Sequence, residues 1–469
     1  MNVKAVLSGG VLALLVATPS AFASGPERVQ AQAAEHAVVE LWEALLPLGS
    51  VNSLMNTGAH PDDERSSLLA YLSRGEGAHV VSVTANRGEG GQNAIGTEYE
   101  EALGALRSRE MEEASRAFAV DLYFLSEGGA DRITDFGFSK TPEEALAYWG
   151  EEETLRRLVR TIRESRPDVL FTSFLDVYGQ HGHHRAMTQA TLRAYRLAAD
   201  PEAFPEQLAE GLRPWAPRKL YLPAESGAGS TYADAEPPPP VTLTVDTGMY
   251  NPIFGATYDQ LGEQSRVYHQ SQGMGSWHPE EPSVASLHLL RSRVNTRAVD
   301  SSIFSGLPNT VGDLAEGVSD RLLARMLRAA DGHISDALAS YPDYVSVAGS
   351  VQDALSSVRN ARARLDRLAE RERIGEAQRY DLEFRLAHKA EQLAAASQQA
   401  ALLVTRLEVP EPEDDDLSEY PYVLTPGGST QLTLTTYRGG EVSVSDVSFD
   451  LVVPDGWTAT PEGEPGGVP

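Results

Sequence analysis

The segment VNSLMNTGAHPDDE, residues 51–64, begins as a short apolar run and ends in a cluster of His, Asp and Glu side chains. The same change from a β-favouring run to a helical pattern recurs along the next part of the chain. The predicted strands are residues 51–57, 79–84, 121–125 and 168–173, and the predicted helices are residues 64–72, 100–117, 151–164 and 184–197. Strands that alternate with helices pair in parallel, so the sequence predicts an α/β fold with a doubly wound, mostly parallel, Rossmann-like sheet.

A second His cluster follows the fourth predicted strand. It reads HGHH, residues 181–184, and it opens the next helix. Ligand sites in open α/β sheets lie outside the carboxyl ends of the strands, so both clusters are expected at one edge of the sheet. Alone, an Asp pair is common in a solvated turn and a His-rich tripeptide is common at a surface. Their matched placement favours a shared functional site.

The chain has no cysteine, so any metal at this edge must be held by His and carboxylate ligands. A zinc hydrolase needs about three such ligands, an open position for water, and a nearby carboxylate that takes a proton from that water. Two His, one Asp and a spare Asp meet this requirement.

These motifs resemble those of the PIG-L/LmbE-like deacetylase family. AHPDDE, residues 59–64, resembles the family signature, and HGHH resembles its His-x-Asp-His element. Three weaker segments follow in the family's order: TANRGEGG at residues 84–91, Arg109-Glu110 on a predicted helix, and HQSQ at residues 269–272. The resemblance covers roughly residues 51–290.

The resemblance implies a role for each residue of the two clusters. His60, Asp63 and His184 would bind Zn²⁺. Asp62 would be the general base and later the acid that protonates the leaving amine, and His181 would stabilise the oxyanion.

Three further residues are candidates for substrate binding. Arg87 and Glu89 lie in the Gly-rich stretch, where glycines allow a ligand to approach the backbone closely, although a charged surface turn is an equal alternative. Arg109 lies on a charge-rich helix whose default is a solvated face, so its role in a pocket rests on the resemblance alone.

The sequence departs from the family pattern at His183, which stands where the family usually has Asp. That Asp would orient and charge the neighbouring His, so the charge state of His181 is open. Asp176 is a candidate replacement for the carboxylate, and Tyr178 could offer a hydroxyl to the oxyanion. His269 is either a partner of the site residues or an ordinary buried histidine.

Changes in composition divide the rest of the chain. The expected order is a signal peptide at residues 1–23, a helical lead-in at 24–50, the deacetylase domain at 51–300, a helical domain at 310–406, an acidic linker at 407–420 and a partial β-sandwich at 421–469. The first segment has the basic start, apolar stretch and small-residue cleavage site of a secretory signal, with an uncleaved anchor as the alternative. We therefore expect a secreted or periplasmic protein. A sandwich needs about seven strands, so we expect the last domain to be truncated in this sequence.

The formal charge of −28 repels phosphate backbones and argues against nucleic acid as a partner. No transmembrane segment is expected in the mature chain. With the family resemblance, the sequence predicts a secreted zinc-dependent deacetylase that hydrolyses the N-acetyl amide of an amino sugar. Two alternatives stay open: a catalytically silent carbohydrate-binding or surface protein, and an amidohydrolase of a non-sugar N-acyl compound.

Overall fold

The computed structural model describes residues 37–225, 237–277, 279, 281–294, 299–408, 428–444, 451–453 and 456–460. The chain divides into two compact units. The sheet unit is Gly49–Asp313, and the helical unit comprises the described residues of Met1–Leu48 and Leu314–Pro469. The predicted signal peptide lies outside the described residues.

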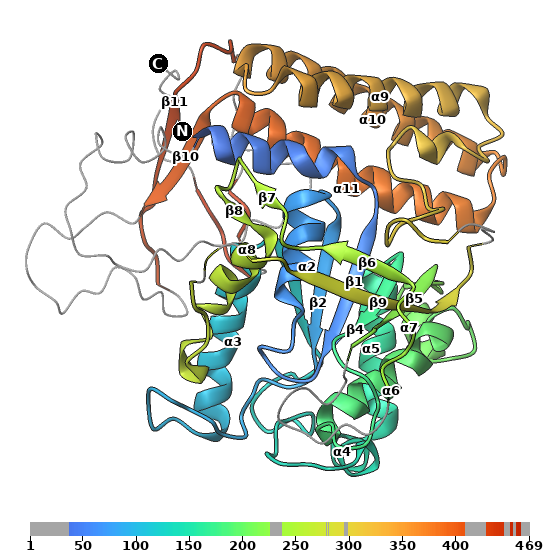
Figure 1. Ribbon diagram of the computed structural model, residues 1–469. Helices are drawn as coiled ribbons and strands as arrows, with labels where there is room; N and C mark the ends of the chain where they lie inside the picture. The colour runs from blue at the N-terminus through green and yellow to red at the C-terminus, as the bar shows by residue number, and fades with distance from the viewer. Residues whose placement is uncertain are drawn as a thin grey trace, which may run out of the picture. The chain divides into compact units, whose positions relative to one another are not determined.

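The sheet unit is built on seven strands in the order β3-β2-β1-β4-β5-β9-β6 (Figure 1). Their bounds are β1 Ser53–Gly58, β2 His79–Thr84, β3 Val120–Phe124, β4 Val169–Thr172, β5 Lys219–Pro223, β6 Leu243–Asp246 and β9 Val284–Ser292. The first five strands in this order pair in parallel, and β9 runs antiparallel to both of its neighbours. The predicted doubly wound, mostly parallel sheet is confirmed. The strand order reverses between β1 and β4, which is where such sheets bind ligands.

Two groups of helices cover the sheet, one on each side (Figure 1). On one side α2, α3 and α8 pack together, and on the other side α4, α5 and α6 do so. The bounds are α2 Ser66–Ala70, α3 Glu100–Ala117, α4 Pro142–Trp149, α5 Glu151–Ser165, α6 Gly182–Leu197, α7 Pro205–Ala209 and α8 Tyr258–Arg266. Because both faces are covered, β1 and β4 are buried along their whole length.

The helices of the sheet unit differ from the prediction in two respects: one is shorter than predicted, and α4, α7 and α8 were not among the predicted helices. The helix predicted at residues 64–72 is the short α2 followed by a π-helical turn, Tyr71–Gly75, because residues 59–65 form the turn that carries the first cluster. The signals of α4 were local: the Thr141 hydroxyl accepts a hydrogen bond from the Glu144 amide, and Pro142 occupies the first turn.

Arg163 on α5 holds the chain that follows α6. Its guanidinium is buried and donates to the Gln207 side chain and to five backbone carbonyls, those of Leu197, Ala198, Asp200, Ala203 and Phe204. These contacts satisfy carbonyls at the end of α6 that have no partner within that helix.

Replacing Arg163 with Met is therefore expected to lower the free energy of unfolding by roughly 3 kcal/mol or more, because several buried carbonyls lose their donor at once. Urea denaturation followed by circular dichroism measures this change. Arg160→Met on the same helix is the matched control, since its ion pairs with Glu164 and Glu210 are near the surface and contribute less than about 1 kcal/mol. Equal effects of the two substitutions would contradict the assigned role.

The helical unit contains three long helices, α9 Arg321–Ser340, α10 Tyr344–Glu370 and α11 Glu376–Ala400. Helix α10 packs against both others, and short connections make neighbours antiparallel. Asp320 caps α9 by accepting from the Leu323 amide, and its carboxylate also pairs with Arg364 of α10. Residues 37–45 are helical as well and continue into a 3₁₀ turn, Leu46–Gly49.

Lys389 of α11 is buried within this unit, where its ammonium donates to the carbonyls of Pro47 and Leu48. Burial lowers the pKa of Lys389 to about 7. Between about pH 7 and the ordinary pKa of about 10.5, the unfolded chain keeps the proton and the folded chain releases it, so stability rises with pH in that window. Lys389→Met is expected to flatten this rise in urea titrations at pH 7 and pH 10. An unchanged pH dependence would contradict the lowered pKa.

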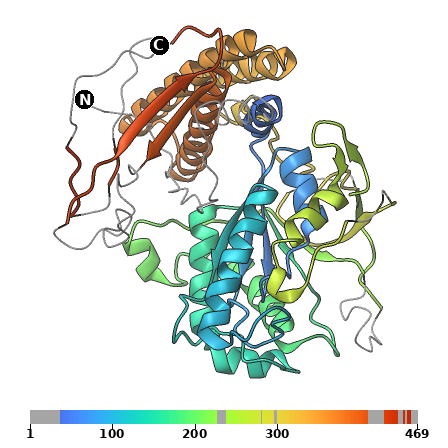
Figure 2. The same cartoon turned by 90° about the vertical axis from the view of Figure 1, so that its left-hand side faces the viewer.

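Two antiparallel strands follow the helices, β10 Leu403–Glu408 and β11 Thr433–Arg438 (Figure 2). β10 lies across the boundary at residue 406 between the predicted helical domain and the predicted linker. β11 lies within residues 421–469, the predicted partial β-sandwich, of which residues 428–444, 451–453 and 456–460 are described. The sandwich stays a prediction. Among the helices that the structure describes, none combines the length and apolar character needed to cross a bilayer.

Candidate active site

The two His clusters meet at the carboxyl ends of β1 and β4. Nδ1 of His60 lies 3.0 Å from Nε2 of His184. Oδ2 of Asp63 lies 3.4 Å from the first of these nitrogens, and Oδ1 of the same carboxylate lies 3.2 Å from the second. Residues 124 positions apart thus bring two ring nitrogens and both oxygens of one carboxylate together, at the edge of the sheet where the topology predicted that the clusters would meet.

This donor set fits a metal ion. Ligand atoms about 2.1 Å from a tetrahedral zinc lie roughly 3.4 Å from one another, which matches the observed spacing. The electrostatics of the cluster also fit a bound cation. Burial alone would lower the pKa of His60, but the charge and hydrogen bond of Asp63 outweigh burial and raise this pKa to about 9. Burial likewise opposes ionisation of Asp63, and the two histidines overcome it and hold the pKa of this carboxyl well below its usual range. The site therefore favours a cation.

Backbone amides near Asp63 hold its carboxylate in place. One oxygen accepts from the amides of Ala59 and His60 at 2.7 and 2.8 Å. The absence of a side chain at Gly58 leaves space for the Asp63 side chain, since a Cβ at Gly58 would lie 2.7 Å from the Asp63 Cβ. His184 is fixed by Gln180, whose Oε1 lies 2.8 Å from its Nδ1, and by the stacked ring of Phe174.

Asp62 is held in a strained backbone conformation, with φ at 109°. Three contacts stabilise it: the Asp62 amide donates to Glu64 at 3.1 Å, Arg266 donates to the Asp62 carbonyl at 3.1 Å, and Gln272 donates to the Pro61 carbonyl at 3.1 Å. Burial and the neighbouring charge of Asp63 raise the pKa of Asp62 to about 7. A carboxyl with such a pKa exchanges protons readily near neutral pH.

His269 contacts the turn that carries Asp62 through the side chain of Glu64. Its Nε2 lies 3.1 Å from Oε1 of Glu64, and both side chains are fully buried. Burial opposes charge on both partners, but their mutual attraction raises the pKa of His269 and lowers that of Glu64. His269 therefore contacts the residue that holds the Asp62 amide.

His181 is the N-cap residue of α6 and borders the cluster, with its ring centroid 5.2 Å from that of His60. Burial, then the nearby His60 and His184, lowers the pKa of His181 to about 4. Its Nε2 lies 3.2 Å from both the Ser139 amide and the Gly137 carbonyl. A ring nitrogen of His181 is also close enough to join His60 and His184 as a ligand. We favour Asp63 as the third ligand because its carboxylate lies at ligand spacing from both.

Arg87 and Glu89 fix the loops beside the cluster. Arg87 donates to the Ser108 hydroxyl and the Ser126 carbonyl, and its guanidinium lies over the Phe124 ring. Buried Glu89 accepts from the amides of Arg87 and Asp135. Both side chains are therefore engaged by protein groups.

The structure does not bring Arg109 to the cluster. This side chain is 52% exposed and pairs with Glu112 and Glu113 of its own helix. Arg107, two positions earlier and so on the opposite face of α3, is buried and donates to the Gly88 carbonyl and the Ser271 hydroxyl. Its charge also interacts with that of Asp62.

Of the remaining candidates, one lies in the cluster. His183 is fully buried, with Nδ1 2.9 Å from Nε2 of His60. Asp176 instead pairs with Arg185 and Gln189, so it does not orient His181. Tyr178 is 79% exposed.

Sequence reasoning missed three residues here: Glu64 as a support, Arg107 and Asp135. Helical periodicity could have found Arg107, because Leu103, Arg107 and Ala114 lie at spacings that share the buried face of α3. Asp135 lies in an irregular loop, where no periodicity marks it.

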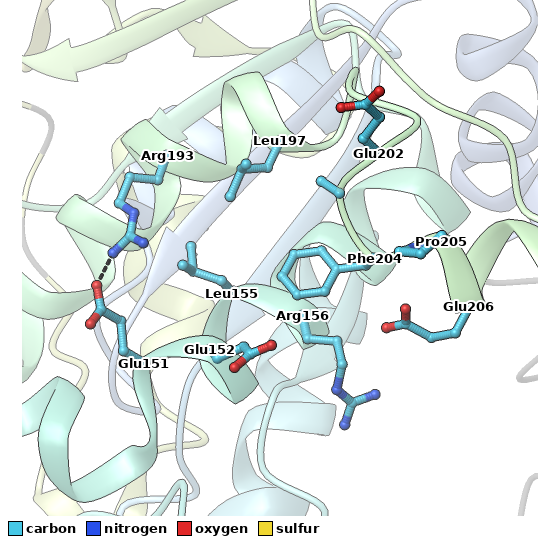
Figure 3. A pocket seen from close by; sticks show the side chains of 11 residues that line it. Glu151, Glu152, Leu155, Arg156, Arg193, Leu197, Glu202, Phe204, Pro205 and Glu206 are labelled. Atoms are coloured by element: carbon cyan, nitrogen blue, oxygen red, sulfur yellow. Dashed lines mark hydrogen bonds and ion pairs between the residues drawn. The ribbon is translucent and has the colours of Figure 1, made fainter.

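A hollow of about 560 Å³ lies elsewhere in the sheet unit, between α5, α6 and residues 202–206 (Figure 3). Its lining mixes apolar side chains with Glu and Arg, including the Glu151–Arg193 ion pair drawn in Figure 3, and contains no histidine. We place the candidate active site at the His cluster, because that is where ligand atoms converge beside an ionisable carboxyl.

Comparison with known proteins agrees with this placement. The family model described as PIG-L, GlcNAc-PI de-N-acetylase, matches residues 55–195. A 1D-myo-inositol 2-acetamido-2-deoxy-alpha-D-glucopyranoside deacetylase from Thermomonospora curvata is 39% identical over 181 residues, which are 35% of this chain and 58% of that relative. The match thus spans less than two thirds of the relative's length.

Two solved structures show weaker likeness. An N,N'-diacetylchitobiose deacetylase from Pyrococcus horikoshii matches with a TM-score of 0.34 and 19% identity, covering 54% of this chain and 81% of that chain. A 4-carboxy-2-hydroxymuconate hydratase from Pseudomonas putida matches with a TM-score of 0.34 and 17% identity, covering 53% and 99%. Neither score assigns an activity. The family match, by contrast, runs from β1 to α6 and includes both His clusters, so the chain contains a PIG-L family domain at residues 55–195.

Proposed function

We propose that this protein is a zinc-dependent hydrolase that removes the acetyl group from the nitrogen of an amino sugar. The observation that carries the proposal is the convergence of His60, Asp63 and His184 beside Asp62, within a PIG-L family domain. The named activity of the Thermomonospora relative, on an acetylated glucosamine joined to inositol, supports this substrate class.

The three ligand residues would hold the zinc ion, which would polarise the amide carbonyl and lower the pKa of water. Asp62 takes a proton from the attacking water as hydroxide adds to the amide carbon. It then gives this proton to the nitrogen as the C–N bond breaks, so that acetate and a free amine leave. A pKa of about 7 suits both transfers, because the carboxyl is partly ionised near neutral pH.

His181 stabilises the oxyanion as a neutral donor in this scheme. Its lowered pKa, about 4, means that an N–H dipole and not a full positive charge faces the developing negative oxygen. Preorganised dipoles of this kind stabilise a transition state because they need not reorient during the reaction.

We also propose that the protein acts after secretion, with residues 1–23 as its signal peptide. The basic start, apolar stretch and small-residue cleavage site support this address. The substrate would then be an extracytoplasmic glycan, glycolipid or amino-sugar conjugate.

The test is acetate release by the zinc-loaded full chain from a panel of N-acetylglucosamine compounds, with N-acyl amino acids as the non-sugar arm. Acetate from the sugar arm alone, abolished by a chelator and restored by zinc, is the expected result. Release from the non-sugar arm alone would favour the different-amide alternative. No release despite one bound zinc per chain would favour a binding protein.

A further inference from the structure

His60 has a second ring nitrogen on the side opposite the proposed metal ligands. This atom, Nε2, lies 2.9 Å from Nδ1 of His183. The same Nδ1 lies 3.6 Å from a carboxylate oxygen of Asp135. One ligand atom from each of these three residues lies within 4.8 Å of the other two.

Among the described residues, the side chain of His183 makes its polar contacts through one ring nitrogen only. Its ring is fully buried, with its centroid 4.3 Å from that of Phe136 and 4.9 Å from that of Trp149. Nε2 of His183 has no hydrogen-bond partner among the described residues, so the polar contacts of this ring are made through Nδ1.

The proton positions follow from the role of His60. A histidine that binds a metal through Nδ1 keeps its remaining proton on Nε2, so His60 donates and His183 accepts. Metal-binding histidines usually donate this proton to a carboxylate, a carbonyl or water, which orients the ring and strengthens it as a ligand. A neutral imidazole can orient the ring but brings no negative charge. A carboxylate oxygen of Asp135 lies 3.6 Å from the His183 side of this contact.

Asp135 is itself held firmly. Its amide donates to Glu89 at 3.0 Å, and its Oδ1 accepts from the Gly137 amide at 2.9 Å. Gly90 makes room for the side chain, since a Cβ there would lie 2.5 Å from the Asp135 carboxylate. The loops after β2 and β3 therefore cooperate to keep one negative charge beside the His60–His183 contact.

We propose that His183 and Asp135 act together as the positioning pair of His60. His183 accepts the hydrogen bond that fixes the ring, and Asp135 supplies the negative charge that a single carboxylate at position 183 would otherwise provide. This inference rests on the metal site proposed above, but it concerns metal affinity and not turnover.

A double-mutant cycle on the full chain tests the pair, with zinc affinity measured by competition against a chromophoric chelator. Asp135→Asn is expected to weaken zinc binding by about 10–100-fold. His183→Asp places a carboxylate directly at Nε2 of His60, so the charge of Asp135 is no longer needed there. In the His183→Asp background, Asp135→Asn is therefore expected to change zinc affinity by less than about threefold. The effects of the two substitutions would then be strongly non-additive. Glu127→Gln, an exposed change in the same loop, is the control for charge alone.

A second comparison keeps the proposal testable if Asp135→Asn folds poorly. His183→Gln retains an acceptor for the His60 proton and is expected to bind zinc more tightly than His183→Phe by about tenfold or more. Equal affinity of these two variants, or an equal effect of Asp135→Asn in both backgrounds, would overturn the pair. A wild-type chain that binds no zinc would instead refute the metal site itself, and zinc binding without deacetylation would leave this inference standing.

Discussion

Asp62→Asn is expected to abolish deacetylation while zinc remains bound. The substitution removes the proposed general base, which would take a proton from water and return it to the amine. General acid–base catalysis typically contributes about 10²–10⁴-fold in rate. We expect kcat to fall by that factor with KM little changed. Steady-state acetate release, measured beside zinc content, checks both halves of the expectation.

The fold should tolerate this change. Asn has nearly the shape of Asp and is among the residues that accept positive φ most readily. The substitution also removes a carboxyl whose ionisation is opposed by burial and by the charge of Asp63. The melting temperature should therefore not fall. Asp121→Asn, at a largely exposed carboxylate that pairs with His79, is the matched control and should keep full activity. An Asp62→Asn variant within tenfold of wild-type kcat would remove Asp62 from the mechanism.

His184→Ala is expected to lose both the metal and the activity. It deletes one of the three proposed ligands, so zinc affinity should fall by more than the roughly 10–100-fold that is typical of losing a residue that only contacts a ligand. Activity should then depend on the zinc concentration in the assay. Metal competition titrations and acetate release at several zinc concentrations measure the two effects.

The control for His184→Ala is His79→Ala, because His79 pairs with Asp121 away from the cluster. It should bind zinc as the wild type does. If His184→Ala also retained wild-type zinc affinity, the ligand set would have to be reassigned, and His181 would be the first candidate to replace it, since its ring nitrogen is already within reach of His60.

The sequence predicted those parts of the fold that periodicity encodes. Strand β2 and helix α3 have the predicted bounds, because an apolar run and a helical pattern stand out over six or more residues. The meeting of His60 with His184 was also predictable, since parallel strands deliver their carboxyl ends to one edge of the sheet.

What the sequence could not predict depends on loops and on distant pairings. Asp135 reaches the cluster through a loop held by Glu89 and Gly137, where no periodicity applies. Arg107 differs in this respect, because the periodicity of α3 separates its buried face from the exposed face that carries Arg109. The antiparallel placement of β9 is set by partners on both sides, and no local pattern reports it.

The supports of Asp62 also set an order of events during synthesis. Arg266, His269 and Gln272, which hold this turn directly or through Glu64, lie more than 200 residues further along the chain. A nascent chain that has just completed residue 195 possesses every proposed ligand, but the strained backbone at Asp62 has not yet met the groups that stabilise it. The ribosome must therefore synthesise α8 and the following turn before these contacts can stabilise the backbone at Asp62, so the proposed general base is completed late in synthesis.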